Sequence, residues 1–234
     1  MPLTTPQPKW VKDLLSDLRP YEDRVVNHPV FVQLSIGELP VPALQKALVN
    51  FYPLIESFPQ FMQLNLAKVP DGHSSPHNET RAWLISNIRQ ERYHAVWWKD
   101  FALGFGVEPK AFDNGITPPA QMDSINNYLW RVCTNNTLIE GMAASNYAVE
   151  GPTGTWTKNV QEGFRFYQGL PGVEINEKTL AWINAHATYD DSHPWEALEI
   201  IKAYAVSSEA QQSVKLAAMR SLEYYALALD YVLR

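Results

Sequence analysis

Histidines that lie beside acidic residues are the clearest sign of chemistry in this chain. In the segment His186-Ala-Thr-Tyr-Asp190-Asp-Ser-His193, residues 186, 190 and 193 fall at about 0°, 40° and −20° around a helix that turns about 100° per residue. These three side chains are therefore predicted to point the same way. Asp191 falls near about 140° by the same count and is interpreted as a solvent-facing acid.

Two further pieces carry carboxylates into apolar surroundings. In Glu91-Arg-Tyr-His94, a spacing of three places a carboxylate and an imidazole on one helix face. Glu150 follows a run of mostly small and apolar residues at 143–149, in which a lone acid stands out. Because buried acids are rare unless they are paired or bound to metal, both pieces are candidates for a metal site.

Together these pieces supply three imidazoles and three carboxylates. The set is Glu91, His94, Glu150, His186, Asp190 and His193. Nitrogen and oxygen ligands without thiolates suit iron or manganese rather than copper(I) or a thiolate zinc site. The ionised carboxylates carry −3 and two ferrous ions bring +4, so two metals fit better than one. Either piece alone could be a surface ion pair, whereas their joint presence favours a metal centre. A ferritin-like bundle would need a second Glu-x-x-His motif, which this chain lacks.

Composition limits the classes of protein that the chain can belong to. Its 234 residues are 46% hydrophobic and 19% charged, which predicts one domain over residues 1–234 with a real core. The net charge of −6 and the scattered basic residues argue against nucleic acid or an anionic membrane as partner. The single cysteine, Cys133, points to a reducing compartment, and neither a signal peptide nor a membrane span is recognised. A cytoplasmic protein is expected.

Apolar residues recur at spacings of three and four through most of the chain, which predicts an all-α fold. Seven main helices are expected, at residues 10–27, 42–66, 77–105, 120–150, 155–167, 177–206 and 209–233. Pro53 and Pro59 fall inside the second helix and are expected to kink it. Pro194 directly follows His193, so this ligand is expected at a kink that alters the site.

The ligand order resembles that of a known family. Glu-x2-His, then Glu, then His-x3-Asp-x2-His is similar to the pattern of the haem-oxygenase-like di-iron oxidases and oxygenases, of the TenA and pyrroloquinoline-quinone C superfamily. Segments 27–31, 37–39, 57–59 and 98–103 resemble its chlamydial branch, which includes a protein that associates with death domains. The resemblance implies a multi-helix bundle that holds two irons, or iron with manganese, at the six residues. It also implies reaction with O2 to oxidise a small substrate, an amino acid or fatty acid derivative, with electrons from an unidentified donor. A homodimer is expected on the same ground.

This sequence departs from one group of family members at two positions. The p-aminobenzoate-forming members consume one of their own tyrosines, and the matching position here is Phe31. Their amino-donor lysine matches the region of Val160, with Lys158 two residues away. The sequence therefore favours an external substrate over self-consumption.

Two alternatives from other classes stay open. One is an interaction protein with a vestigial metal site, as the partner binding of the chlamydial relative suggests. The other is a metal-free cofactor-metabolism enzyme similar to TenA or PqqC, for which Cys133 is the candidate nucleophile, although this thiol is interpreted as structural. Haem binding would fall to His28, which precedes Pro29 and is predicted to lie in a turn.

Overall fold

The computed structural model describes residues 7–72, 74–113, 115–189 and 192–234. Within these residues every regular element is helical, which confirms the predicted all-α class. The α-helices are α1 (Lys9–Val26), α2 (Pro29–Ser35), α3 (Val41–Leu66), α4 (Ser75–Glu91), α5 (His94–Gly104), α6 (Ala120–Asn135), α7 (Leu138–Met142), α8 (Glu150–Val160), α9 (Ala181–Tyr189), α10 (His193–Tyr204) and α11 (Ser208–Val232). Two 3-10 helices, η1 (Pro109–Phe112) and η3 (Gln161–Tyr167), and a π-helix, η2 (Ala143–Tyr147), complete the described elements.

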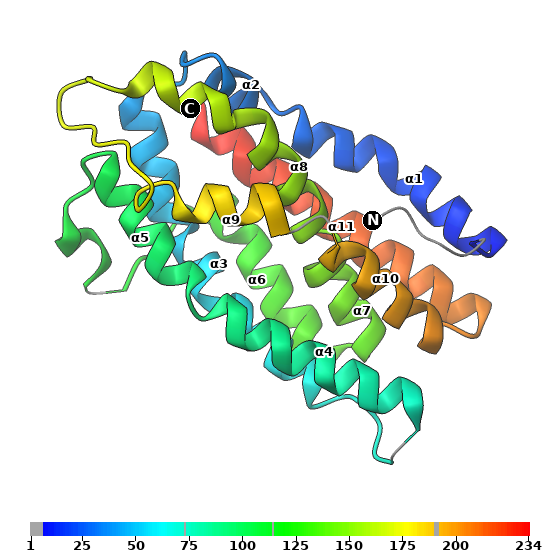
Figure 1. The fold of residues 1–234 in the computed structure, drawn as a ribbon. Coiled ribbons are helices and arrows are strands. Elements are labelled where there is room, and N and C mark those ends of the chain that lie inside the picture. The colour runs from blue at the N-terminus through cyan, green and yellow to red at the C-terminus, as the bar shows by residue number, and fades with distance from the viewer. Residues whose placement is uncertain (1–6, 73, 114, 190–191) are drawn as a thin grey trace.

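The long helices form a bundle around α3, α6 and α11 (Figure 1). α11 packs between α6 and α1, while α3 packs on α6, α4 and α5. Apolar side chains at helical spacing explain these contacts: on α1, the buried residues Val11, Leu14, Leu18 and Val25 form one stripe that faces the core. No helix in the described part of the chain is both long enough and apolar enough to cross a membrane.

The chain between residues 120 and 150 does not form the single helix that was expected. α6 ends at Asn135, and Asn136 is extended with φ −97° and ψ −177°. Thr137 then starts α7 with a capping box, in which Glu140 Oε2 accepts from the Thr137 backbone N–H at 3.0 Å. The Thr-x-x-Glu pattern is a readable start signal that the apolar periodicity masked. As a result Glu150 begins α8 instead of ending the preceding helix.

Two other expected helices are also divided. The helix predicted at 77–105 is interrupted at residues 92–93, and the one at 177–206 separates into α9 and α10 on either side of the undescribed residues 190 and 191. Pro194 lies in the first turn of α10, where its missing N–H costs nothing. The prediction that His186 and His193 share one helix face is therefore wrong, because these two residues belong to different helices.

The short helices α2 and η1 were not predicted. The turn expected at His28-Pro29 instead opens α2, with the His28 Nδ1 atom accepting from the Val30 N–H at 3.2 Å. The His28 Nε2 atom lies 3.1 Å from Asp230 Oδ1 on α11. His28 thus caps one helix and ties it to another.

Candidate metal centre and cavity

Five of the six predicted ligands are described, and four of these lie at helix ends. Glu91 is the last residue of α4 and His94 the first of α5, while Glu150 begins α8 and His193 begins α10. His186 lies inside α9. The sixth predicted ligand, Asp190, lies outside the described residues. The breaks between helices therefore bring ligands from five elements to one region.

The described ligands form two acid–imidazole pairs and one ring contact. Glu91 Oε2 lies 2.7 Å from His94 Nδ1. Glu150 Oε2 lies 3.5 Å from His193 Nδ1, at the outer limit of a hydrogen bond. The rings of His94 and His186 approach to 4.6 Å between centroids, which joins α5 to α9. Glu91, His94, Glu150 and His186 are all buried, at 5 to 8% exposure.

Burial dominates the ionisation of the site. It raises the pKa of the Glu150 carboxyl; the negative charge of Glu91 adds to this shift, while His193 and Asn146 oppose it. Burial also holds the pKa of His186 well below its ordinary value, and the proximity of His94 acts in the same direction. A neutral imidazole is the form that can donate a lone pair to a metal.

The backbone fixes the orientation of the His186 ring. Its Nδ1 atom lies 2.8 Å from the Trp182 carbonyl oxygen, one helical turn earlier. Because a carbonyl can only accept, Nδ1 carries the proton and Nε2 carries the lone pair. The ring also stacks on the Trp182 indole at 3.8 Å between centroids. Sequence reasoning did not single out Trp182, although its position four residues before a predicted ligand is the available signal.

Glu150 is the carboxylate with unused acceptor capacity. Asn146 Nδ2 donates to its Oε1 atom at 2.7 Å. Its Oε2 atom is buried and makes no hydrogen bond of ordinary length with the described residues, and its polar neighbour there is His193 Nδ1 at 3.5 Å. A buried carboxylate oxygen without a donor is costly, and a bound cation would offset that cost.

The donor set fits iron in its chemistry, and the described side chains are arranged as pairs. Neutral imidazole nitrogens and carboxylate oxygens are the ligands that non-haem iron uses. Among the described residues, no three His, Cys, Asp or Glu side chains converge as a ligand group. The six-ligand, two-metal centre therefore stays a prediction.

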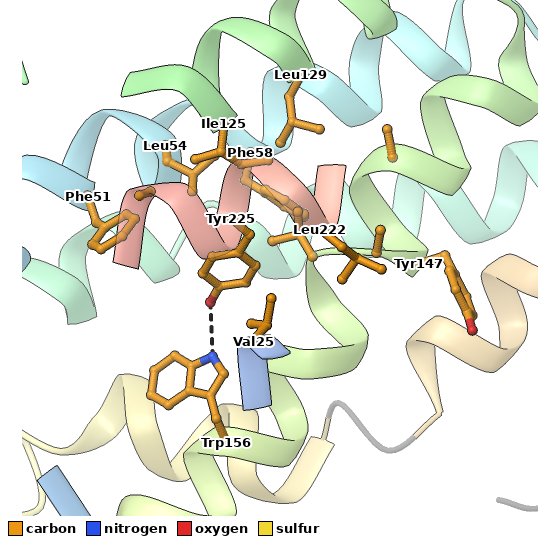
Figure 2. Packing of buried hydrophobic residues seen from close by; sticks show 14 of the residues in the cluster. Val25, Phe51, Leu54, Phe58, Ile125, Leu129, Tyr147, Trp156, Leu222 and Tyr225 are labelled. Carbon is orange, nitrogen blue, oxygen red and sulfur yellow. Dashed lines mark hydrogen bonds between the residues drawn. The ribbon is translucent and has the colours of Figure 1, made fainter. Parts of the chain in front are cut away.

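An apolar cavity of about 90 Å³ adjoins the pairs. Glu91, His94, Glu150 and His186 form part of its wall. The rest of the wall is mainly aliphatic and aromatic, and includes Phe31, Phe51, Leu54, Phe58, Trp98, Trp156, Ile183 and Leu229. Figure 2 shows Phe51, Leu54 and Phe58 among the buried side chains near Tyr225. The described lining contains no lysine or arginine.

The hydroxyl groups on this wall bond to one another. Trp156 Nε1 donates to the Tyr225 hydroxyl at 2.9 Å (Figure 2). Tyr225 and Thr153 hydroxyls lie 3.2 Å apart, and the Thr153 proton is donated to the Val149 carbonyl at 2.7 Å. Tyr225 must therefore donate to Thr153. The indole N–H and both hydroxyl protons are thus all donated to other residues of the wall. These hydrogen bonds could not be foreseen from residue spacing, since their members come from two separate helices, α8 and α11.

The residues behind the alternative functions also have definite positions. Phe31 lies on the cavity wall, stacked on Trp156 at 4.2 Å between centroids. Val160 is fully buried and Lys158 is exposed. Cys133 is buried in α6 and does not line the cavity, and burial raises the pKa of its thiol to about 11. A thiol with so high a pKa is a poor nucleophile near pH 7.

Comparisons with known proteins identify the family and the fold of the chain. A family model described as an iron-containing redox enzyme, of haem-oxygenase type, matches residues 45–226. A 4-aminobenzoate synthase of Chlamydia trachomatis is 25% identical over 190 residues, which cover 80% of this chain and 77% of the relative. The crystal structure of a TenA homologue from Pseudomonas syringae is 30% identical and superposes with a TM-score of 0.86, covering 97% of this chain and 93% of that one.

A more distant structure shows the fold alone. A CADD-like protein of unknown function from Nostoc punctiforme is 14% identical, with a TM-score of 0.69 and 95% coverage of each chain. The family model spans more than three quarters of the sequence, and the resemblance seen in the ligand order is confirmed at the level of the family. The chain belongs to the haem-oxygenase-like family of iron-containing redox enzymes.

Proposed function

We propose that this protein is a non-haem di-iron oxidase or oxygenase that uses O2 to oxidise a fatty acid derivative. One observation carries the proposal: a buried group of carboxylates and imidazoles opens directly onto an apolar cavity. The irons would be held by Glu91, His94, Glu150, His186, Asp190 and His193. When bound in the ferrous state, the metals would supply the electrons that activate O2 for oxidation of a C–H, C–C or C–N bond.

The surrounding residues prepare this site for its task. The Trp182 carbonyl holds the His186 ring in the tautomer that presents Nε2. Burial excludes water from the reacting region, which strengthens every electrostatic interaction inside it and protects reactive species from side reactions. The stacked Phe31 and Trp156 rings form a rigid apolar surface against which a substrate can be positioned.

The wall chemistry favours a fatty acid derivative over an amino acid. An amino acid brings an ammonium and a carboxylate group, and burying either without a partner is costly. The described cavity lining has no lysine or arginine, and the protons of Trp156, Tyr225 and Thr153 are already donated within the wall. An alkyl chain needs no such partners, and its polar head can lie at the carboxylate and imidazole end of the cavity.

The chlamydial relatives are named 4-aminobenzoate synthase, yet Phe31 argues for a different substrate here. Phenylalanine has no phenol to be consumed, and Val160 has no amine to be donated. An external molecule must then supply the atoms that are oxidised. A function in partner binding alone would give no role to the buried pair of Glu150 and His193 or to the adjoining cavity.

The experiment is anaerobic reconstitution with ferrous iron, followed by measurement of metal content and O2 uptake. Wild type is compared with His186→Ala and Glu150→Ala, each with straight-chain fatty acids of increasing length and with a panel of amino acids. We expect about two irons per chain, O2 uptake that fatty acids accelerate, and loss of both in the two variants. Absence of stoichiometric iron in the wild-type protein would overturn the proposal, and acceleration by amino acids alone would overturn the substrate class.

A further inference from the structure

A chain of buried amides and hydroxyls leads from the Glu150 carboxylate into the bundle. Asn146 Nδ2 donates to Glu150 Oε1 at 2.7 Å, and Asn146 Oδ1 lies 3.2 Å from Ser145 Oγ. Ser145 Oγ lies 2.8 Å from the Gly141 carbonyl, and Asn65 Nδ2 approaches Ser145 Oγ at 3.5 Å. Asn65, Ser145 and Asn146 are all 0% exposed. Burying such polar side chains in an apolar bundle costs free energy unless each one is hydrogen-bonded, so we expect them to have a function.

The π-helix η2 determines how this series of polar side chains is oriented toward the site. The Ala148 N–H bonds to the Ala143 carbonyl five residues earlier at 3.1 Å, while the Val149 N–H returns to the four-residue spacing with Ser145. One inserted residue rotates the following chain by about 100° relative to an uninterrupted α-helix. The insertion therefore sets the side from which Glu150 enters the site, while the spacing of four residues keeps Asn146 within reach of that side chain.

We propose that Asn146 is a positioning residue that holds Glu150 Oε1, so that Oε2 is turned toward a divalent cation; this inference rests on the proposed function. The amide occupies one carboxylate oxygen, while the other makes no hydrogen bond of ordinary length with the described residues and lies 3.5 Å from His193 Nδ1, a second predicted ligand. A carboxylate anchored through one oxygen can bind a metal through the second without losing side-chain freedom at that moment. Removing such a partner weakens metal affinity by about 10- to 100-fold.

A purely structural role for Asn146 predicts a different result. In that case the amide only donates a hydrogen bond to a buried carboxylate, and its removal lowers the stability of the protein without changing its affinity for the metal. Asn65→Ala is the matched control, because Asn65 is an equally buried asparagine of the same polar chain that does not touch Glu150. Asn146→Leu is a second variant of nearly the same size that lacks the donor and fills the apolar space that alanine would leave.

The test uses Co²⁺ as a redox-stable probe for the ferrous ion. Visible absorbance titrations of the full chain give the Co²⁺ dissociation constant and the d–d spectrum, and circular dichroism shows that each variant is folded. We expect Asn146→Ala and Asn146→Leu to bind Co²⁺ about 10- to 100-fold more weakly with a changed d–d spectrum, while Asn65→Ala keeps the wild-type affinity and spectrum.

The measurements distinguish a failure of the positioning role of Asn146 from a failure of the proposed function. If wild type binds Co²⁺ and folded Asn146→Leu binds it equally well with the same spectrum, the positioning role is overturned and the proposed function stands. An equal loss of affinity in Asn65→Ala would also overturn the role, because general loosening of the bundle would then explain the effect. If wild type binds neither Co²⁺ nor Fe²⁺, the proposed function fails and the positioning role fails with it.

Discussion

Removing the Tyr225 hydroxyl tests whether the cavity wall is held together by its hydrogen-bond relay. Tyr225→Phe keeps the ring but deletes the acceptor of the Trp156 N–H, which lies 2.9 Å away, and the donor to Thr153, which lies 3.2 Å away. Thr153 keeps its bond to the Val149 carbonyl, so the indole is the group left without a partner. A buried donor that loses its acceptor costs about 1–3 kcal/mol, so we expect a loss of about 2 kcal/mol.

Urea unfolding followed by circular dichroism measures this loss, which corresponds to a Tm lower by about 4–8 °C in a chain of this size. Tyr128→Phe is the matched control, because the Tyr128 hydroxyl makes a single bond, of 3.1 Å, to the Ala217 carbonyl. That change orphans no donor and should cost about 0.5–1.5 kcal/mol.

A double-mutant cycle separates the relay from general repacking. Trp156→Phe removes the donor itself, so the double variant with Tyr225→Phe should cost less than the two single changes together, by about 1 kcal/mol. Additive effects, or a Tyr225→Phe variant as stable as the Tyr128→Phe control, would refute the claim that the wall spends its donors internally. The wall could then donate hydrogen bonds to a polar substrate, and a fatty acid derivative would no longer be favoured over an amino acid.

Three further predictions follow from burial and capping. Burial holds the pKa of His186 below its ordinary 6.5, so the unfolded chain takes up a proton first as the pH falls and stability is lost below about pH 6.5. Urea unfolding at about pH 7.5 and 5.5 should show a smaller loss of stability in His186→Gln than in wild type. Equal losses in the two proteins would contradict this assignment. Cys133→Ser should leave ferrous O2 uptake unchanged, because the thiol lies outside the cavity wall and its pKa is about 11; abolished uptake would revive the thiol-nucleophile alternative. Thr137→Ala removes the capping box and should cost about 1 kcal/mol, seen as a lower urea midpoint with an unchanged slope, whereas no shift would show that α7 is held by packing alone.

The fold class could be predicted because apolar periodicity alone decides it, whereas the helix boundaries depend on local chemistry. The stripe on α1 and the apolar run of α3 fix both helices to within a residue or two of their expected limits. Between residues 120 and 150, apolar residues resume at helical spacing after the polar run at 134–137, so periodicity alone joined two separate helices into one. The break is encoded instead by a side-chain hydrogen bond at Thr137, a short-range signal that a long apolar pattern hides.

The candidate site was predictable in its residue types and less so in its geometry. Glu91 and His94 meet because a spacing of three keeps two side chains together even across a locally interrupted helix. His186 and His193 were expected on one helix, and Pro194 instead opens a new one. The residues that contact the predicted ligands, such as Asn146 beside Glu150, are ordinary polar residues whose contacts depend on which side chain lies opposite, and spacing alone does not report that.

Helix ends offer a physical reason for building the centre where the chain breaks. His94, Glu150 and His193 each begin a helix of eleven or twelve residues, α5, α8 and α10. The positive end of a helix favours a nearby negative charge by about 0.3–1 kcal/mol, so at the start of α8 it favours the carboxylate form of Glu150 that binds a divalent metal. Glu91 lies instead at the negative end of α4, with its Oε2 atom 2.7 Å from His94 Nδ1. Of the described carboxylates, Glu91 is therefore the one whose position a bound cation should change most.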